Sequence, residues 1–552
     1  MNKKIQNIIY KTTCILAPVL ICSTSLFAQR DTTRKQSIDI TSSYKPVLRN
    51  AIKINFSGSQ LPADTSRSLL QYNIPAQNLF YAYQPISLRP LALAQDTNLY
   101  LGMRRYIKAG FGSYTTPYVN AGFSFGDGKK SLVNIYGDYI ASKGTDIVNQ
   151  DYSQVHIKGA GSLFSAKNEV YASAAISREQ YYLYGYDHKI LSFTKDQVSQ
   201  QFQDVTTSIG IRNTVALPYR ISYDPHVKVN FFTNIDKLSE TTIRFDLPVE
   251  KKIAESFALK VEATGAFTNY STKNYIGGLK LTNNLIQLAP SLKYVAPRLH
   301  INAGLTPVWN NGAFEWLPNI YAEAQLQEKV FMLQAGFVGR YINNTYHNLS
   351  AINPYLAPIK ALINTREAEL YGGIKASLGS HFNVSAKASW ISYENMPLFI
   401  NDTASNEKSF RISNERSMNN LRIHGNASYI NQDKFTVTAA LTLNGYTGLN
   451  DNAKAWHTIP MEFSSSIRWL AFERILIKGD FKFFNGGKYL AKNNNAMLLS
   501  GGTDLSAGAE FKINKQFSVW LDINNILNDK YERWHNYPVY GLNLLGGILI
   551  HF

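Results

Sequence analysis

The chain of 552 residues has only two cysteines, Cys14 and Cys22, and both lie near its start. Lysines precede an apolar run there, and Ala28 stands where signal peptidase would cleave, so residues 1–28 are predicted to be a secretory signal peptide. The mature chain would then contain no cysteine. This excludes a disulfide, a thiolate metal site and a cysteine nucleophile.

Long apolar runs are also missing. After residue 28 no stretch reaches the roughly 20 apolar residues that a membrane-spanning helix needs, although 45% of the chain is hydrophobic and 13% is aromatic. Backbone polar groups in lipid must be paired internally, so a chain that spans a membrane without such helices has to form a closed β-barrel.

Catalytic motifs are absent as well. The sequence has no G-x-S-x-G, H-E-x-x-H, P-loop or EF-hand pattern, and its ten histidines are dispersed. His347 and His457 fall in predicted external loops, and His188 follows Asp187. Isolated polar residues in loops are usually solvated surface. We therefore expect no enzyme, no catalytic or metal-ligating residues and no cofactor.

Strict alternation of apolar and polar residues is what the sequence does have. From 257 to 267 every second residue is apolar or small, and the last strand alternates in the same way up to the terminal Phe552. Each such stretch is about 9 to 11 residues long, the length of a tilted membrane strand. Sustained from residue 106 to 552, this pattern predicts an all-β fold: a transmembrane antiparallel up-and-down β-barrel.

Along the chain, short links alternate with long links between these stretches. The clearest short links are 127–128, 166–168, 379–381, 431–433 and 514–515; the long links are 144–151, 183–204, 345–365, 400–417, 447–455, 486–498 and 528–541. This pattern is typical of barrels in the outer membrane of Gram-negative bacteria, with turns in the periplasm and loops outside. It predicts about 22 strands, with the N-terminus in the periplasm.

The chain is basic. Its formal charge is +17, or +14 once the three signal-segment lysines Lys3, Lys4 and Lys11 are removed. Because Lys and Arg are spread singly along the chain rather than clustered in one motif, we do not expect a nucleic-acid partner. The charge instead favours attraction to anionic head groups of outer-membrane lipid, or a cationic lumen.

The C-terminal region resembles the end of TonB-dependent receptors. In that family an N-[LI]-[FL]-[ND]-x-x-Y stretch precedes the last hairpin, and it is matched here by Asn525, Ile526, Leu527, Asn528 and Tyr531. The resemblance implies a 22-stranded outer-membrane barrel. The abundance of Asn, Tyr and Lys is similar to that of proteins of the Bacteroidota type. The terminal aromatic residue Phe552 is expected to be the assembly signal that outer-membrane insertion machinery reads.

The N-terminal segment departs from that family. TonB-dependent receptors carry a folded plug domain of well over a hundred residues, whereas only residues 29–105 lie between the predicted signal peptide and the barrel. Pro75, Pro85 and Pro90 interrupt this segment. It is predicted to be a periplasmic or lumenal extension. It could be an extended linker, or a reduced plug or arm that docks a periplasmic or surface partner protein.

Two classes of function are consistent with these features. The first is a barrel that transports or takes up a ligand across the outer membrane, as the resemblance implies. The alternative is a non-transporting structural subunit of an outer-membrane assembly, secretion or surface-anchoring complex. Aromatic stretches such as 181–186, and Trp456, would either belong to the interfacial aromatic girdle or stack on a flat ligand such as a sugar.

Overall fold

The computed structural model describes residues 105–552 apart from 216–218, 273–277, 328–330, 380 and 432–433. Residues 1–104 lie outside the described part of the chain. The signal peptide at 1–28 and the extension at 29–105 therefore stay predictions, and the first described strand begins at Arg105, one residue before the predicted start of the barrel.

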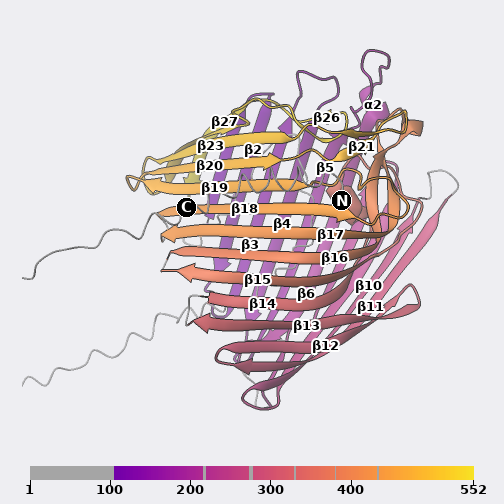
Figure 1. Ribbon diagram of the computed structural model, residues 1–552. Helices are drawn as coiled ribbons and strands as arrows, with labels where there is room; N and C mark the ends of the chain where they lie inside the picture. Colours follow the sequence, from indigo (N-terminus) through magenta and orange to yellow (C-terminus); the bar gives the residue numbers. More distant parts are fainter. Residues whose placement is uncertain (1–104, 216–218, 273–277, 328–330, 380, 432–433) are drawn as a thin grey trace, which may run out of the picture. The chain divides into compact units, whose positions relative to one another are not determined.

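The described residues form one closed barrel of 22 antiparallel wall strands (Figure 1). Each wall strand pairs with its neighbours in sequence, and the first strand closes the ring by pairing with the last, so that Tyr106 lies opposite His551. The short strand β7 pairs with β9 beside the start of β8 and adds no wall strand of its own. The predicted 22-stranded antiparallel barrel is confirmed.

The wall strands are β1 (Arg105–Gly112), β2 (Thr116–Gly126), β3 (Ser131–Ser142), β4 (Tyr152–Phe164), β5 (Asn168–Tyr182), β6 (Ser199–Asn213), β8 (His226–Asn234), β9 (Ser239–Lys252), β10 (Phe257–Ser271), β11 (Lys280–Ala296), β12 (Leu299–Asn310), β13 (Ala313–Gln327), β14 (Phe331–Ile342), β15 (Thr365–Leu378), β16 (Phe382–Asn401), β17 (Phe410–Asn431), β18 (Phe435–Thr447), β19 (Met461–Ala471), β20 (Ile475–Phe484), β23 (Gly502–Lys512), β24 (Phe517–Asn524) and β27 (Asn543–His551).

The links contain the remaining elements: β7 (Ile221–Tyr223), α2 (Lys195–Val198), α3 (Tyr346–Ile352), the 3-10 turn η1 (Thr403–Ser405), β21 (Lys488–Leu490), β22 (Ala496–Leu498), β25 (Glu532–Trp534) and β26 (Tyr537–Pro538). No helix among the described residues is long and apolar enough to cross a membrane.

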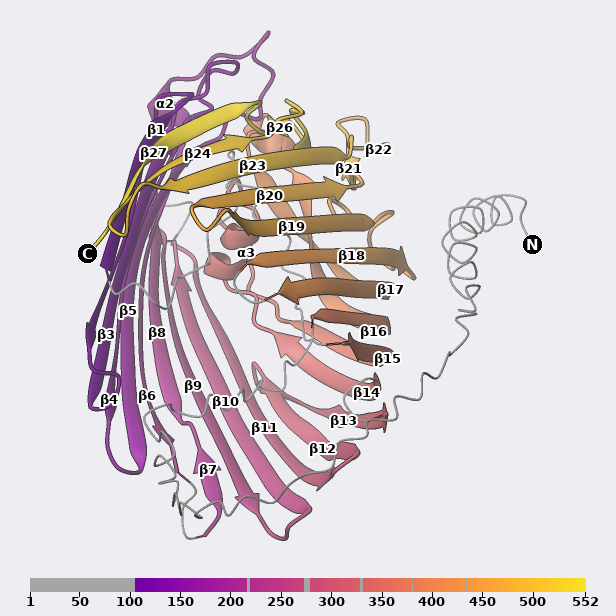
Figure 2. The same ribbon diagram turned by 90° about the vertical axis from the view of Figure 1, so that its left-hand side faces the viewer.

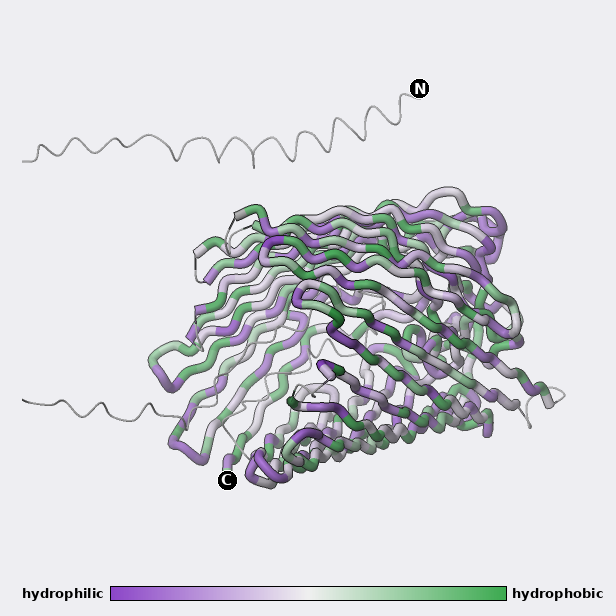
Figure 3. The backbone as a smooth tube through the Cα atoms, turned by 90° about the horizontal axis from the view of Figure 1, so that it is seen from below, coloured by the Kyte–Doolittle hydropathy of each residue, from purple (hydrophilic) through white to green (hydrophobic). Residues whose placement is uncertain are grey.

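The two faces of the wall differ as the alternation predicts. In β24 the side chains of Val519 and Leu521 are 40% and 49% exposed on the outside, whereas Ser518 and Trp520 point inward and are buried. Figure 3 shows the same alternation of hydrophobic and hydrophilic residues along strand after strand. The outer surface is therefore apolar and the inner surface polar, as a barrel in lipid requires.

The links lie at two rims. Among the described residues, the short-turn rim consists of 127–130, 165–167, 214–215, 219–225, 253–256, 297–298, 379, 381, 434, 472–474 and 513–516; the long-loop rim holds 113–115, 143–151, 183–198, 235–238, 272, 278–279, 311–312, 343–364, 402–409, 448–460, 485–501 and 525–542. The alternation of short and long links is thus confirmed for most of the barrel. It fails at 113–115, 235–238 and 311–312, which are short links of the long-loop rim, and at 214–225, which is a long link of the short-turn rim.

One predicted loop is corrected. The stretch 400–417 was expected to be a long loop, but β16 and β17 continue as paired strands and leave only 402–409 between them. The reason is apolar burial: Leu398 and Met418, on these extended strand ends, pack in one cluster with Trp456 of the neighbouring loop. That burial stabilises strand pairing beyond the end of the neighbouring wall strands.

Placing a charge on the two faces of β10 tests this assignment. Val261→Arg puts a guanidinium into lipid and should reduce the free energy of unfolding by about 2 to 4 kcal/mol near the membrane midplane. Thr264→Arg, on the same strand but facing the lumen, should be tolerated. Urea unfolding in lipid bilayers measures both variants, and equal losses for the two would contradict the assignment of faces.

Candidate functional site

Five long loops fold inward over one end of the barrel. They are 183–198, 343–364, 402–409, 448–460 and 525–542, and we call them together the loop cap. Figure 2 shows α3, which belongs to the second of them, lying within the ring of strands rather than outside it. Loops 183–198, 343–364 and 525–542 share one buried core with the adjoining strand ends, and His457 of loop 448–460 packs against it at Phe410 and Trp534.

Aromatic side chains dominate that core. The rings of Tyr355 and Tyr537 stack with their centroids 3.6 Å apart, and Tyr184 lies 4.7 Å from Tyr537. Phe410 packs edge-on against Trp534 at 5.4 Å. All five side chains are buried. The cap is consequently packed like the interior of a folded domain.

The cap crosses the mouth of the barrel. Loop 343–364 leaves the wall between β14 and β15, yet the carbonyl of Leu356 accepts a hydrogen bond from Gln200 Nε2 on β6 at 3.3 Å. The adjacent carbonyl of Tyr355 accepts one from the backbone N–H of Phe410 on β17 at 2.9 Å. Because β17 is the tenth wall strand after β6 in a ring of 22, these two contacts join nearly opposite walls.

A second contact bridges the same two walls. The ammonium group of Lys408, in loop 402–409, lies 3.7 Å from the ring centroid of Phe193 in loop 183–198. Burial lowers the pKa of Lys408. A cation over an aromatic face is attracted by the ring quadrupole, more strongly when both groups are shielded from water.

Helix α3 is fastened to the wall by a carboxylate. Glu240 on β9, 1% exposed, accepts hydrogen bonds from the backbone N–H groups of Tyr346 at 2.7 Å and His347 at 3.1 Å. The side chain of Thr345 caps the helix by accepting from the N–H of Asn348 at 3.1 Å. Unpaired donors at the start of a helix need such acceptors, so these contacts fix the direction of the loop.

Asparagines hold both ends of loop 343–364. Asn364 donates to Asn283 on β11 and to Asn310 on β12, each at 2.8 Å, while Asn283 donates to Asn343 at 3.0 Å. The backbone N–H of Asn344 also donates to the Asn364 side chain at 3.2 Å. Residues 343–344 and 364 thus clamp the two ends of the loop together. Sequence reasoning missed this clamp, and the asparagine pairs at 310–311 and 343–344 were its signal.

The family-like motif builds the last loop of the cap. Asn525 donates from its side chain to the carbonyls of Asp529 at 2.8 Å and Tyr540 at 2.9 Å, and the Asn528 side chain accepts from the N–H of Leu542 at 2.9 Å. Asn525 and Asn528 both have positive φ angles, 48° and 54°, which asparagine tolerates better than most residues.

The other motif residues lie at the edges of this turn. Tyr531 is buried and donates to Asp504 at 3.1 Å, and the N–H of Ile526 donates to the carbonyl of Leu505 at 2.7 Å, while Leu527 is 51% exposed. Phe552 lies apart from the cap, at the other end of β27, with its side chain exposed and its N–H bonded to the carbonyl of Arg105 at 3.0 Å. Its part in assembly stays a prediction.

Both interpretations of the aromatic stretch at 181–186 are corrected. Tyr181, Tyr184 and Tyr186 are 3–4% exposed, and Trp456 is 4% exposed, so these rings neither face lipid nor offer a surface to a ligand. Tyr184, Tyr186 and Trp456 are buried because their loops fold inward instead of standing in solvent, and Tyr181, on β5, is buried because it packs against Tyr355 of the cap. Other residues form the girdle on the outer surface, among them Phe125, Phe257, Phe331, Phe382, Phe511 and Phe517.

Each of the three loop histidines packs against a different set of aromatic rings. The His188 ring lies tilted against Tyr186 with the centroids 4.0 Å apart, His347 lies 4.8 Å from the Phe232 ring, and His457 packs between Phe410 and Trp534, 5.3 Å from each. Within the described residues no group of three or more His, Cys, Asp or Glu side chains could hold a metal ion.

His457 makes the cap sensitive to acid. Burial, reinforced by the nearby charge of Arg533, lowers the pKa of its imidazole to about 3, against the opposing effect of the hydrogen bond to the Phe399 carbonyl at 2.7 Å. An opened cap would restore an ordinary pKa of about 6.5. The closed form therefore keeps its full stability above pH about 6.5 and loses it as the pH falls, by about 2 kcal/mol at pH 5.

Hydrogen exchange of cap amides at pH 7.5 and pH 5.0, corrected for intrinsic rates, measures this loss. His457→Asn retains an N–H donor for the Phe399 carbonyl and cannot titrate, so it should remove about 2 kcal/mol of the pH dependence. An unchanged pH dependence in that variant would contradict the assignment.

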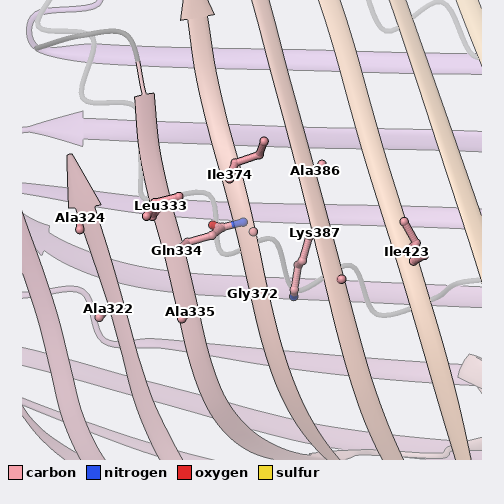
Figure 4. Close-up of a pocket in the computed structure, with 12 residues that line it drawn as sticks. Ala322, Ala324, Leu333, Gln334, Ala335, Gly372, Ile374, Ala386, Lys387 and Ile423 are labelled. Carbon is pink, nitrogen blue, oxygen red and sulfur yellow. The ribbon is translucent and has the colours of Figure 1, made fainter. Parts of the chain in front are cut away.

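A shallow hollow of about 530 Å³ lies on the outer face of the wall, across β13 to β17 (Figure 4). Small residues form its floor: Ala322, Ala335, Gly372 and Ala388 lie side by side on successive strands. Leu333, Ile374 and Ile423 border it and are exposed. The hollow faces lipid and adds nothing to the polar lumen.

Comparison with solved structures places this barrel among known folds. The FrpB iron transporter from Neisseria meningitidis (F3-3 variant) superposes with a TM-score of 0.63 at 11% sequence identity, covering 81% of each chain. The siderophore receptor PirA from Acinetobacter baumannii gives 0.62 at 10% identity, covering 81% of this chain and 80% of its own. The barrel has the fold of TonB-dependent receptors.

A third such structure, the ferric enterobactin receptor PfeA from Pseudomonas aeruginosa, gives a TM-score of 0.59 at 11% identity, covering 81% of this chain and 80% of its own. No protein-family model and no curated protein matches the chain. At such identities the TonB-dependent receptor fold is shared, whereas side chains that bind a ligand in those receptors cannot be transferred residue by residue.

Proposed function

We propose that the protein lies in the outer membrane of a Gram-negative bacterium and carries a ligand across it, entering through the long-loop rim when the loop cap opens. The 22-stranded barrel with the TonB-dependent receptor fold carries this proposal. A lumen of this size is wide enough to need closure, and the cap supplies a closure at one mouth. FrpB is named as an iron transporter, PirA as a siderophore receptor and PfeA as a ferric enterobactin receptor.

One observation favours the alternative, a non-transporting structural subunit of an outer-membrane complex. The cap is packed as tightly as a domain core: Tyr346, Leu356 and Phe410 are fully buried and belong to one cluster. A cap that never opens would make the barrel a scaffold whose wall and rims bind partners. The two functions therefore differ in whether the cap moves.

Cross-linking the cap distinguishes them. The mature chain is predicted to have no cysteine, so the double variant Phe193→Cys/Lys408→Cys offers a unique pair across the mouth, joined by a short bismaleimide. If the barrel transports, cross-linked cells should lose uptake at least tenfold, on the order of the effect of blocking a gating step. The readout is growth on limiting nutrients, with each nutrient class supplied in turn.

The two single-cysteine variants are the controls. Each single cysteine variant treated with the same reagent should behave like the untreated double variant. A cross-linked cap that leaves growth on every nutrient unchanged would contradict transport through this mouth and leave the structural role.

A further inference from the structure

The two rims of the barrel differ in charge. Described links of the short-turn rim contain the basic residues Lys129, Lys130, Lys167, Arg220, Arg298, Lys434, Arg474 and Lys515 against the acidic residues Asp127, Asp224, Glu255 and Glu473. Lys251 and Lys252 add to this surplus at the end of β9. All ten basic side chains are exposed. The short-turn rim is therefore strongly cationic.

The long-loop rim is nearly neutral by comparison. Its described links contain the basic residues Lys143, Lys189, Lys195, Lys237, Lys360, Lys408, Lys454, Lys488, Lys492, Lys530 and Arg533 against the acidic residues Asp146, Asp151, Asp187, Asp196, Asp236, Asp402, Glu407, Asp451, Asp529 and Glu532. Several of these are paired with one another, as Lys530 is with Asp146 at 2.6 Å.

The lumen does not account for the positive charge either. Cations on the inner wall face carboxylates: Arg340 pairs with Glu367 at 2.5 Å, Lys387 with Glu369 at 2.7 Å and Lys375 with Glu323 at 3.1 Å. The sequence left two explanations for the basic charge, attraction to lipid head groups and a cationic lumen. The distribution of charge favours the first.

The cations lie just beyond a row of exposed aromatic side chains at the ends of the strands. Phe125, Phe257, Phe511 and Phe517, exposed on the outer face, mark where strands leave the hydrocarbon. The basic residues follow within a few positions, as Lys129 and Lys130 follow Phe125. Apolar side chains accompany them in the turns, where Phe472 is 86% and Ile253 is 61% exposed.

We infer that the short-turn rim is a binding collar for anionic phospholipid head groups. The exposed phenylalanines insert among the acyl chains, and the ring of Lys and Arg side chains just beyond them contacts phosphate and other negative groups. Each cation adds to the electrostatic attraction, and the attraction weakens as the salt concentration rises. The collar would hold the barrel at a fixed depth and gather anionic lipid around it.

Native mass spectrometry of the purified full chain tests the collar, with dioleoylphosphatidylglycerol and dioleoylphosphatidylcholine as probes at equal concentration. The anionic lipid should bind at least about tenfold more tightly, since several cations act together. In the fivefold variant Lys129→Gln/Lys130→Gln/Lys167→Gln/Lys251→Gln/Lys252→Gln, the preference should fall to about twofold or less.

A matched variant serves as control: Lys143→Gln/Lys189→Gln/Lys237→Gln/Lys360→Gln/Lys454→Gln removes five exposed lysines from the long-loop rim and should keep the wild-type preference. Heat-modifiable mobility on gels confirms that both variants are folded. Equal binding of the two lipids by the wild-type protein, or an equal loss in both variants, would overturn the collar. Equal lipid binding would point to an acidic protein as the partner of this rim.

Discussion

Excising the central loop of the cap should turn a closed barrel into an open channel. The backbone N–H of Asn344 donates to the Asn364 side chain at 3.2 Å, so the ends of this loop are close enough for residues 345–363 to be replaced by two glycines. The excision removes α3, Tyr355 and Leu356, which join opposite walls. The other four loops of the cap remain, but Tyr184 and Tyr537 lose the Tyr355 ring on which they pack. A lumen of 22 strands is wide enough to conduct once its closure is incomplete.

Planar-bilayer recording measures the result. The wild-type protein should give no discrete current steps, and the excised protein should give large ones. Deleting residues 493–495, at the exposed tip of the β21–β22 hairpin, is the control for loop shortening and should leave the barrel closed. An excised barrel that is folded yet silent would show that loop 343–364 is not the part of the cap that closes the barrel.

The predicted extension, residues 29–105, is expected to affect conductance only when the cap has been opened. Removing residues 30–100 from the capped barrel should leave the conductance unchanged, because the cap still closes the mouth. In the excised barrel the same deletion should raise the current of each step at least about twofold if the extension lies in the lumen. The aromatic stretch at 78–85, close to the first strand in sequence, favours that position.

The excised barrel with and without residues 30–100 also tests whether the extension docks a partner protein. If the extension instead docks a periplasmic or membrane partner, deleting it should leave the step size of the excised barrel unchanged and abolish co-purification of that partner. A rise in conductance when the extension alone is removed would show that the cap does not close the mouth.

The wall of this protein is determined by its sequence alone. A period of two needs only nearby residues: Val519 and Leu521 face outward and Ser518 inward because successive side chains of a strand point to opposite faces. Strand number followed from counting such stretches, and most link lengths followed from the breaks between them. At β16 and β17 the strands stay paired beyond the end of the neighbouring wall strands. The alternation of apolar and polar residues stops before the pairing does, so the predicted loop 400–417 was too long.

The cap was decided by tertiary structure. Tyr540 donates its hydroxyl proton to the carbonyl of Gln150, 390 residues earlier in the chain, and Tyr537 donates to the carbonyl of Lys408. Loops have no periodicity to read, and the sequence does not say which loops face one another across a closed ring. Aromatic residues that looked like girdle or ligand platforms became a core because ring closure brought five separate loops over the same opening.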